Sequence, residues 1–434
     1  MNQLFENKIV TEIEPKKLGL IEKRLRVSSH LTIEQTANYL NISKGNLSEI
    51  EKGRRGLKGK VFARFIERFY PDFDWNLSIV KEAEKKLEEL VVAFIYRNSV
   101  QERHVEEWAN QNRKRLLNSL ACLHLTVFET YFYYGKSIDR DEEELLNSSE
   151  DFIQYFPPDT RALLLFNKGY RYMCIGNSSQ AAELFEAALR EMDRKNWPQL
   201  EGIIKLNLAG VIARDVSFRQ AIDLVDQAQE CFEKGAIFLR ILSCYNNKAS
   251  YLCCIGQYEM AVSIVDKVIL NKDTFRDSQS YTLAVSNKIL MEALWGRFEE
   301  ALTFIRNHKS ELNPRRPDNF ILEPYCLLRT GEKRTCLSVM KQYQTYSLGE
   351  DDEAFYKLIK AVISMNTDRV EKAKRKMFQI CRKTKNWGML LIMVQALAYF
   401  YKQTNQNDRL VEVYEWQAML HNHQLPDLCE MQQN

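Results

Sequence analysis

Apolar side chains recur three and four residues apart along most of the 434-residue chain, which is the spacing of one buried face of an α-helix. Leu18, Ile21 and Leu25 begin this pattern, and it continues from Leu77 to Tyr96 and from Val105 to Tyr134. We therefore expect an all-α fold. No stretch approaches the roughly 18 apolar residues that a membrane span needs, and the N-terminus lacks a signal-peptide pattern, so we expect a cytoplasmic protein.

Two short helices separated by a tight turn are predicted between Leu31 and Gly53. Thr32 is placed to cap the first helix, and Gln35 three residues later completes a capping box. Ser43 is placed to cap the second helix, which Gly53 ends. The residues expected to point inward are Ala37, Leu40, Leu47 and Ile50.

The segment around these helices is basic, although the whole chain has a net charge of only +3. Between Lys16 and Arg68 there are 13 Lys and Arg against 5 Asp and Glu, which indicates an anionic partner. With its basic first helix and two short capped helices, the segment resembles the phage-repressor-like helix-turn-helix domain. The resemblance implies a module that binds double-stranded DNA.

By this resemblance, the second short helix is the recognition helix. Lys44 and Asn46 are the expected contacts to base edges, because Lys donates to guanine and Asn pairs with adenine. Three departures from the family pattern leave the operator sequence open: Ile33, Thr36 and Glu49. The full set of predicted DNA-binding residues is Ser43, Lys44, Gly45, Asn46, Ser48, Lys52, Arg54 and Arg55. Alternatively, Ser43 is only a helix cap, and Arg54 and Arg55 are solvated charges.

From Pro157 onward the chain aligns with itself at a spacing of 40 residues. An asparagine begins each of four units, an alanine follows fourteen residues later, and a glycine lies between them in three units, Val216 being the exception. Small residues allow two antiparallel helices to approach, and glycine allows the turn. The pattern resembles the tetratricopeptide repeat, and three weaker units bring the total to seven. HEAT-like repeats are the structural alternative.

The four aligned asparagines are hard to explain as core residues, because a buried amide must be paired. In the repeat that they resemble, this position faces the concave surface, where an amide can bind both N–H and C=O of an extended peptide. The alternative is that they hydrogen-bond to neighbouring helices. The predicted peptide-binding residues are Asn167, Asn207, Asn246, Asn247, Asn287, Arg171, Arg214 and Tyr251.

The predicted organisation is a helix-turn-helix domain at 1–72, a helical linker with degenerate repeats at 73–156, and a right-handed α-solenoid of tetratricopeptide-like hairpins at 157–434. The ten cysteines form no CxxC pair or zinc-like cluster, so we expect reduced and mostly buried thiols. We expect no cofactor, no metal and no enzymatic activity, because no catalytic motif is present. The basic segment 371–383 has no assigned partner.

A DNA-binding head on a repeat body resembles the peptide-pheromone receptors of Gram-positive bacteria, the Rap/Rgg/NprR/PlcR/PrgX family. The resemblance implies a homodimeric quorum-sensing transcription regulator, switched by a short signalling peptide in the groove of the repeats, with either sign of response. Two alternatives remain open. One is a Rap-like inhibitor or phosphatase of a response regulator, and the other is a repressor whose repeats bind a partner protein.

Overall fold

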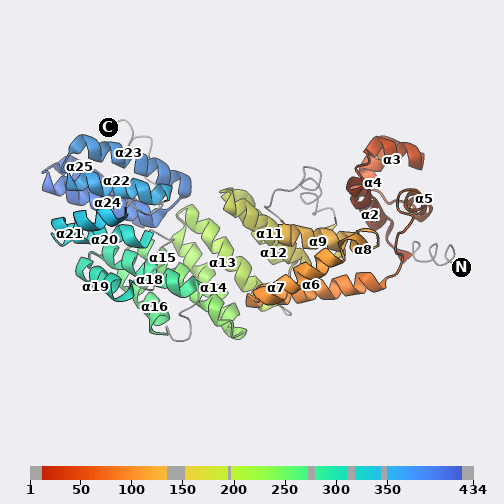
Figure 1. Cartoon of the computed structure of the whole chain (residues 1–434), viewed down its shortest axis with the longest axis horizontal. Helices are drawn as coiled ribbons and strands as arrows, with labels where there is room; N and C mark the ends of the chain where they lie inside the picture. The colour runs from red at the N-terminus through yellow and green to blue at the C-terminus, as the bar shows by residue number, and fades with distance from the viewer. Residues whose placement is uncertain are drawn as a thin grey trace. The chain divides into compact units, whose positions relative to one another are not determined.

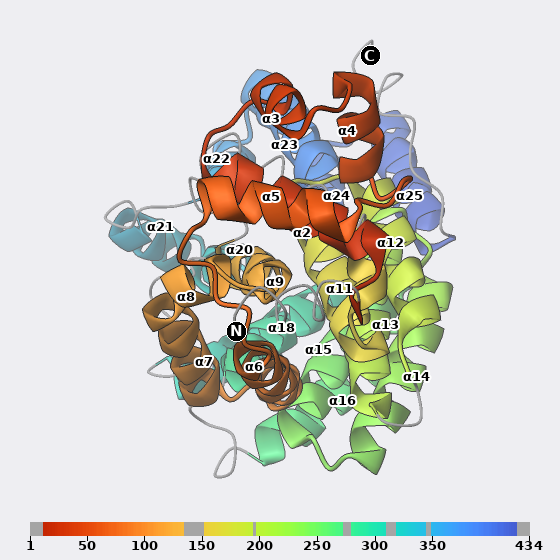
Figure 2. The ribbon, with the colours of Figure 1, turned by 90° about the vertical axis from the view of Figure 1, so that its right-hand side faces the viewer.

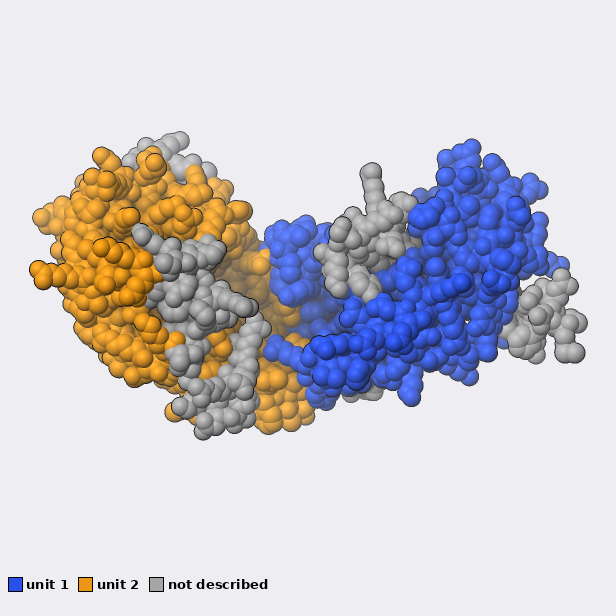
Figure 3. Space-filling model, viewed as in Figure 1, with its two compact units in different colours: residues 1–204 blue, residues 205–434 orange. Residues whose placement is uncertain are grey.

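The structure, a computed structural model, describes residues 12–133, 152–193, 197–271, 279–309, 318–343 and 349–422. These residues form α-helices, a short 3-10 helix and one isolated β-bridge between Asp74 and Ser119 (Figure 1). The all-α class is therefore confirmed. No helix among the described residues is long and apolar enough to cross a bilayer. The chain forms two compact units, residues 1–204 and 205–434 (Figure 3).

Unit 1 is built from helices of 5 to 19 residues and one short 3-10 helix among its described residues. Helix α13 (Pro198–Arg214) runs across the boundary at residue 204. The helices of unit 1 are α2 (Pro15–Ser28), α3 (Ile33–Leu40), α4 (Lys44–Glu51), α5 (Gly59–Phe69), α6 (Ser78–Tyr96), α7 (Ser99–Gln111), α8 (Arg113–Leu117), α9 (Cys122–Tyr133), the 3-10 helix Ile153–Tyr155, α11 (Pro158–Cys174) and α12 (Ser178–Glu191).

We call the first four helices the head; α2, α3 and α4 form where the sequence predicted, and α5 is a further helix that the sequence analysis had not predicted (Figure 2). The Thr32 side chain accepts from the Gln35 backbone N–H while the Gln35 side chain accepts from the Thr32 N–H, so the predicted capping box is present. Asn41 adopts a left-handed conformation that ends α3, and the Ser43 hydroxyl accepts from the Asn46 N–H to start α4. The four residues predicted to point inward are buried: Ala37, Leu40, Leu47 and Ile50.

The apolar core of the head continues into helices α6 to α9. One buried cluster extends from Leu18 in α2, through Phe62 in α5 and Leu87 in α6, to Phe128 in α9 and Leu164 in α11. The boundaries predicted near residues 72 and 156 thus lie within a continuous core, and the three-domain division stays a prediction. The head is anchored to the helices that follow it rather than held on a free linker.

A buried ion pair adds to this anchoring. The Arg24 guanidinium on α2 is only 2% exposed, and its Nη2 lies 2.5 Å from Oε2 of Glu129 on α9. The second Glu129 oxygen lies 3.0 Å from Arg113 Nη2. Because a charge without its partner is costly in a core, Arg24 and Glu129 depend on each other for burial.

Among the described residues between 157 and 422, the helices pair into seven hairpins, which is the number of repeats that the sequence predicted for this part of the chain. The first pairs α11 with α12, and α13 begins the second. The remaining helices are α14 (Phe218–Lys234), α15 (Phe238–Cys254), α16 (Tyr258–Leu270), α18 (Gln279–Trp295), α19 (Phe298–His308), α20 (Asp318–Arg329), α21 (Lys333–Tyr343), α22 (Glu350–Ile363), α23 (Thr367–Thr384), α24 (Trp387–Gln403) and α25 (Asn407–His421).

A residue with positive φ ends the first helix of these hairpins. Gly176, Gly256, Gly296 and Gly331 have φ between 79° and 88°, which glycine adopts without strain. Val216 takes the place of glycine in the second hairpin with φ 57°, so the exception in the sequence keeps the same turn at a steric cost. The repeated glycine position therefore has the physical role that the alignment predicted.

Unit 2 folds back on itself through helix α24, which contacts α15 and α18 in addition to its neighbours in sequence. The Trp387 indole N–H donates to the Ala213 carbonyl oxygen at the end of α13 (3.1 Å), and Lys385 Nζ lies 2.6 Å from Asp215 Oδ1. Gln395 Nε2 donates to the Leu294 carbonyl oxygen at the end of α18. The last hairpin thus packs against the start of the same unit.

The predicted burial of the cysteines is confirmed for the described ones, and Cys429 lies outside the described residues. Eight of the nine described cysteines are buried, and Cys174 is exposed. Cys253 and Cys254 are 4% and 8% exposed, and burial raises the pKa of the Cys254 thiol to about 12. Both thiols therefore pack inside α15 as uncharged groups.

Candidate nucleic-acid and peptide-binding sites

The residues predicted to contact DNA gather at the start of α4 and in the loop after it. Ser43, Lys44 and Gly45 are exposed, and Asn46 is half-buried. Apart from the neighbouring backbone of α4 itself, no atom of the described residues lies within 4 Å of the position that a side-chain Cβ at Gly45 would take, so this end of the helix is open to a partner. Of the other predicted residues, Ser48 is half-buried and Lys52, Arg54 and Arg55 are exposed.

Exposed polar interactions hold several of these side chains in place. Arg55 Nη1 donates to Asn46 Oδ1 (3.1 Å), and Lys44 Nζ lies 3.7 Å from Glu34 Oε2. Glu49, the acid at a family position that is often basic, pairs with Arg54 at 3.2 Å. Exposed pairs of this kind contribute little free energy, so phosphates or bases can replace the partners without a large cost.

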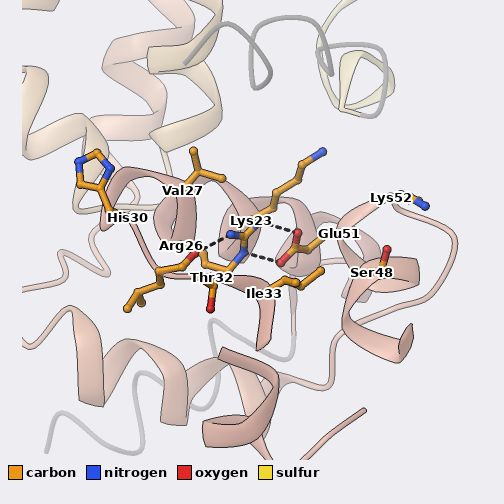
Figure 4. A pocket seen from close by; sticks show the side chains of 10 residues that line it. Lys23, Arg26, Val27, His30, Thr32, Ile33, Ser48, Glu51 and Lys52 are labelled. Carbon is orange, nitrogen blue, oxygen red and sulfur yellow. Dashed lines mark hydrogen bonds and ion pairs between the residues drawn. The ribbon is translucent and has the colours of Figure 1, made fainter. Parts of the chain in front are cut away.

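The structure shows an ion pair that the sequence reasoning missed. Arg26 Nε and Nη2 donate to the two carboxylate oxygens of Glu51 at 2.7 and 2.9 Å, and Arg26 Nη1 donates to the Leu31 carbonyl oxygen (Figure 4). Because both residues are largely buried, this two-pronged contact fixes α4 against α2. No short-range signal identifies the pair, since 25 residues separate its members.

The Arg26–Glu51 pair borders a cavity of about 440 Å³ in the head. Beside it, Glu22 on α2 is fully buried, and neither of its carboxylate oxygens has a hydrogen-bond partner. Burial, together with the nearby Glu51 charge, raises the pKa of Glu22 well above its ordinary value, and the Arg26 charge opposes the shift only in part. The residues that line the cavity are Lys23, Arg26, Val27, His30, Leu31, Thr32, Ile33, Ser48, Glu51 and Lys52.

The predicted peptide-binding asparagines lie at equivalent positions of the first helices of their hairpins. Asn207, Asn247 and Asn287 belong to unit 2 and are half-buried, on α13, α15 and α18. Asn207 takes part in further polar contacts. Asn167 belongs to unit 1, where its side-chain Nδ2 is buried without a hydrogen-bond partner.

Asn246 has a structural role that its neighbour Asn247 does not share. The Asn246 side chain is 1% exposed, and its Nδ2 donates to the Ser280 carbonyl oxygen at 2.8 Å. Its Oδ1 accepts from Asn287 Nδ2 at 3.4 Å. These two bonds join α15 to α18, so Asn246 and in part Asn287 follow the alternative in which asparagines bond to neighbouring helices.

The three remaining predicted residues, Arg171, Arg214 and Tyr251, are all half-buried. Arg171 and Arg214 lie near the ends of α11 and α13. The Tyr251 ring lies 6.4 Å from the Phe218 ring, centroid to centroid, and burial raises the pKa of the Tyr251 phenol. Tyr251 is therefore a half-buried side chain whose ring contacts Phe218 of the second hairpin.

Two further pairs repeat with the 40-residue period. Lys248 Nζ lies 2.6 Å from Asp226 Oδ1, and Lys288 Nζ lies 2.5 Å from Asp266 Oδ1. Each lysine directly follows an aligned asparagine, and each aspartate lies on the second helix of the preceding hairpin. The alignment contained these positions, and reading the charges in register would have found both pairs.

A shallow groove of about 760 Å³ runs along α16 in unit 2. Its lining includes Met260, Ile264 and Trp295, and none of the aligned asparagines. Within the described residues, no group of three or more His, Cys, Asp or Glu side chains is arranged to hold a metal ion.

No family model and no curated protein matches the sequence, whereas several solved structures match the fold. A Rap protein in complex with Competence and Sporulation Factor superposes with a TM-score of 0.56 at 13% identity, over 78% of this chain and 99% of that chain. The apo form of the quorum sensor NprR from B. thuringiensis superposes with a TM-score of 0.57 at 14% sequence identity, over 79% of this chain and 99% of that chain. Aspartyl phosphate phosphatase F from Bacillus subtilis superposes with a TM-score of 0.52 at 15% sequence identity, over 80% of this chain and 94% of that chain. The chain therefore shares the all-α repeat fold of these proteins.

Proposed function

We propose that this chain is a cytoplasmic, homodimeric transcription regulator that binds duplex DNA through α4 and responds to a short peptide bound by its repeats. The observation that carries the DNA-binding part is the geometry of α3 and α4. Both short helices are capped, and the second, α4, is fixed against α2 by Arg26 and Glu51 while its start stays open. A rigid helix with an open N-terminal end suits insertion into a major groove.

Charge supports the same proposal. Lys44, Lys52, Arg54 and Arg55 are exposed around α4 in a segment where basic residues outnumber acidic ones 13 to 5. Phosphate contacts from such residues would supply affinity, and Lys44 and Asn46 are the side chains that we propose for the base edges. Asn46 also accepts from Arg55, so the amide that reads a base and the cation beside it position each other.

The peptide-binding part is supported by the fold that this chain shares with a Rap protein and with NprR. The Rap protein was crystallised with Competence and Sporulation Factor, and NprR is a quorum sensor. Asn207 and Asn247 carry the amides that we propose for the peptide backbone. In a dimer, half-sites lie about one helical turn of DNA apart or a multiple of it, so a small change in head spacing on peptide binding would alter DNA affinity.

The test is fluorescence-anisotropy titration of DNA from upstream of the chain's own gene, with and without peptides encoded beside that gene. Lys44→Ala and Asn46→Ala are expected to weaken specific binding about 10- to 100-fold each, since a good base contact is worth about 1–3 kcal/mol. Glu34→Gln is the control, because it removes only the exposed partner of Lys44. Specific binding that survives both alanine variants would contradict the proposal.

The peptide response is measured in the same titration. Asn247→Ala is expected to abolish the response while DNA affinity without peptide stays unchanged. Asn246→Ala is the matched control, because removing its two buried bonds lowers stability instead, by about 1–3 kcal/mol. A full response in Asn247→Ala would exclude this residue from the peptide site.

The second candidate function is a Rap-like regulator that binds a protein partner. The fold shared with aspartyl phosphate phosphatase F favours it. It predicts that the wild-type chain binds none of the DNA in any state, so the same titration separates the two functions.

A further inference from the structure

Helix α23 has one buried face and one strongly basic exposed face. Between Thr367 and Lys385 the sequence has eight Lys and Arg and only two acidic residues, Asp368 and Glu371. The buried side chains that pack α23 into unit 2 are Val370, Lys374, Met377, Phe378, Ile380 and Cys381. The exposed cations are Arg369, Lys372, Arg375, Lys376, Arg382 and Lys383.

The exposed cations form rows along the helix. Arg375 and Arg382 are seven residues apart, as are Lys376 and Lys383, so each pair is separated by two turns, or about 10.5 Å of rise. Seven residues is close to two full turns, so the two members of each pair lie on the same side of α23, and the two pairs form neighbouring rows about 100° apart around the helix. A linear polyanion laid along this side meets a positive charge at each end of the row.

One carboxylate partly neutralises this face. Glu350 at the start of α22 lies 3.4 Å from Lys376 Nζ and 3.3 Å from Lys383 Nζ. Hydrogen bonds from Lys383 and Lys376 lower the pKa of Glu350, so it is charged at neutral pH. A single acid thus bridges two lysines, and the face keeps a positive excess.

The chemistry of the face favours phosphates over a protein partner. From Thr367 to Thr384 no large apolar side chain is exposed, and Met365 is the nearest one that is. Protein interfaces need an apolar or aromatic centre from which water is excluded, and this helix offers none. The phosphates of a nucleic acid need only cations at a surface.

We propose that the basic face of α23 is a second DNA-binding surface, which contacts phosphates of duplex DNA outside the base pairs contacted by α4. It rests on the proposed DNA-binding function and extends it with a contact that is independent of sequence. The α23 surface contributes to the affinity for DNA and to its salt dependence, while α4 determines which operator sequence is bound.

The triple variant Lys372→Gln, Arg375→Gln and Arg382→Gln tests the proposal on a short duplex of the operator alone and on a duplex about three times longer. On the long duplex, the slope of log Kd against log salt is expected to fall by about 2 to 3, at about 0.9 for each lost phosphate contact. On the short duplex it is expected to stay unchanged. The matched control is Lys333→Gln, Arg334→Gln and Lys341→Gln, which removes three exposed cations from α21.

A second variant is expected to change affinity in the opposite direction. Glu350→Gln releases Lys376 and Lys383 and is expected to tighten binding of the long duplex about two- to fivefold at low salt, by the loss of exposed ion pairs. Glu353→Gln is its control, because it removes the same charge one turn later from a carboxylate that pairs only within α22, with Lys357.

The outcomes separate the two proposals. If Lys44→Ala and Asn46→Ala leave specific binding intact, the proposed function fails. If they abolish it but the α23 variant keeps the wild-type slope on the long duplex, only the α23 surface is overturned. Equal losses in the α21 and α23 variants also overturn it, because a general positive field would then account for both. Circular dichroism melts of each variant exclude unfolding as the cause.

Discussion

At the scale of single residues, the head depends on a carboxyl group that is stable only when protonated. Glu22 is fully buried without a hydrogen bond, and the Arg26 charge nearby is already taken by Glu51. Its folded-state pKa is therefore above the ordinary value of 4.5. The folded state binds the proton more tightly than the unfolded state, so this group stabilises the fold fully below pH 4.5. The stabilisation is lost as the pH rises through the folded-state pKa.

Glu22→Gln is expected to raise the free energy of unfolding at pH 8 and to change it little at pH 4.5. Each tenfold difference in proton affinity between the folded and unfolded states contributes about 1.4 kcal/mol to that gain. Urea denaturation at the two pH values measures it. Glu51→Gln is the control of opposite sign, because it breaks the buried contact with Arg26 and lowers stability at pH 8. A Glu22→Gln variant without a gain at pH 8 would show that the carboxyl is charged and compensated.

Interactions between residues close together in the sequence could be predicted, and those between distant residues could not. The caps at Thr32 and Ser43 were predicted because each acts on an N–H three residues away, within one helical turn. Arg26–Glu51 spans 25 residues and Arg24–Glu129 spans 105, so neither follows from a local pattern. The same holds for Asn246, whose bond to Ser280 separated it from its neighbour Asn247 only once the hairpins were packed.

At the scale of elements, the hairpin turn is where sequence and backbone agree most closely. Gly296 has φ 87°, and no atom lies within 4 Å of a Cβ placed there, so the only cost of a side chain is conformational. The repeat period was readable for this reason: a left-handed residue is required at one position of each hairpin, and glycine meets the requirement most cheaply.

Gly296→Ala is therefore expected to lower the free energy of unfolding by about 1–2 kcal/mol, through left-handed strain alone. Thermal melting by circular dichroism measures the change. Gly45→Ala is the matched control, since it is also in open space but lies inside helix α4, where alanine is favoured over glycine. Equal effects of the two substitutions would contradict the conformational explanation.

At the scale of the whole molecule, described unit by unit, the number and the pairing of the hairpins were predictable and the closure of unit 2 was not. The closure depends on Trp387 and Ala213, which lie 174 residues apart, and on Gln395 and Leu294. No repeat pattern encodes such contacts, because they join hairpins that are not neighbours in the array. In an open array, each repeat is stabilised only by the repeats on either side of it.

Trp387→Ala is expected to speed amide hydrogen exchange in α13 residues 205–214 at least tenfold, although these residues lie far away in sequence. The indole bond and the buried ring at the end of α13 are lost together. Trp416→Ala is the control, because its ring packs on Phe378 within the last hairpins. It should loosen α23 and α25 and leave α13 unchanged. Equal protection of α13 in both variants would mean that the closure does not stabilise it.

Closure also limits how this unit can change in length. An open array tolerates the gain or loss of a repeat, because the repeat at the new end is exposed to solvent and no contact with another part of the array is lost. Here an added or deleted hairpin between α15 and α22 would shift α24 away from Ala213 and Leu294, and both bonds would be lost at once. Duplication and deletion, the usual ways in which repeat proteins diverge, are therefore blocked inside unit 2, and variation in repeat number is expected only outside that closed segment.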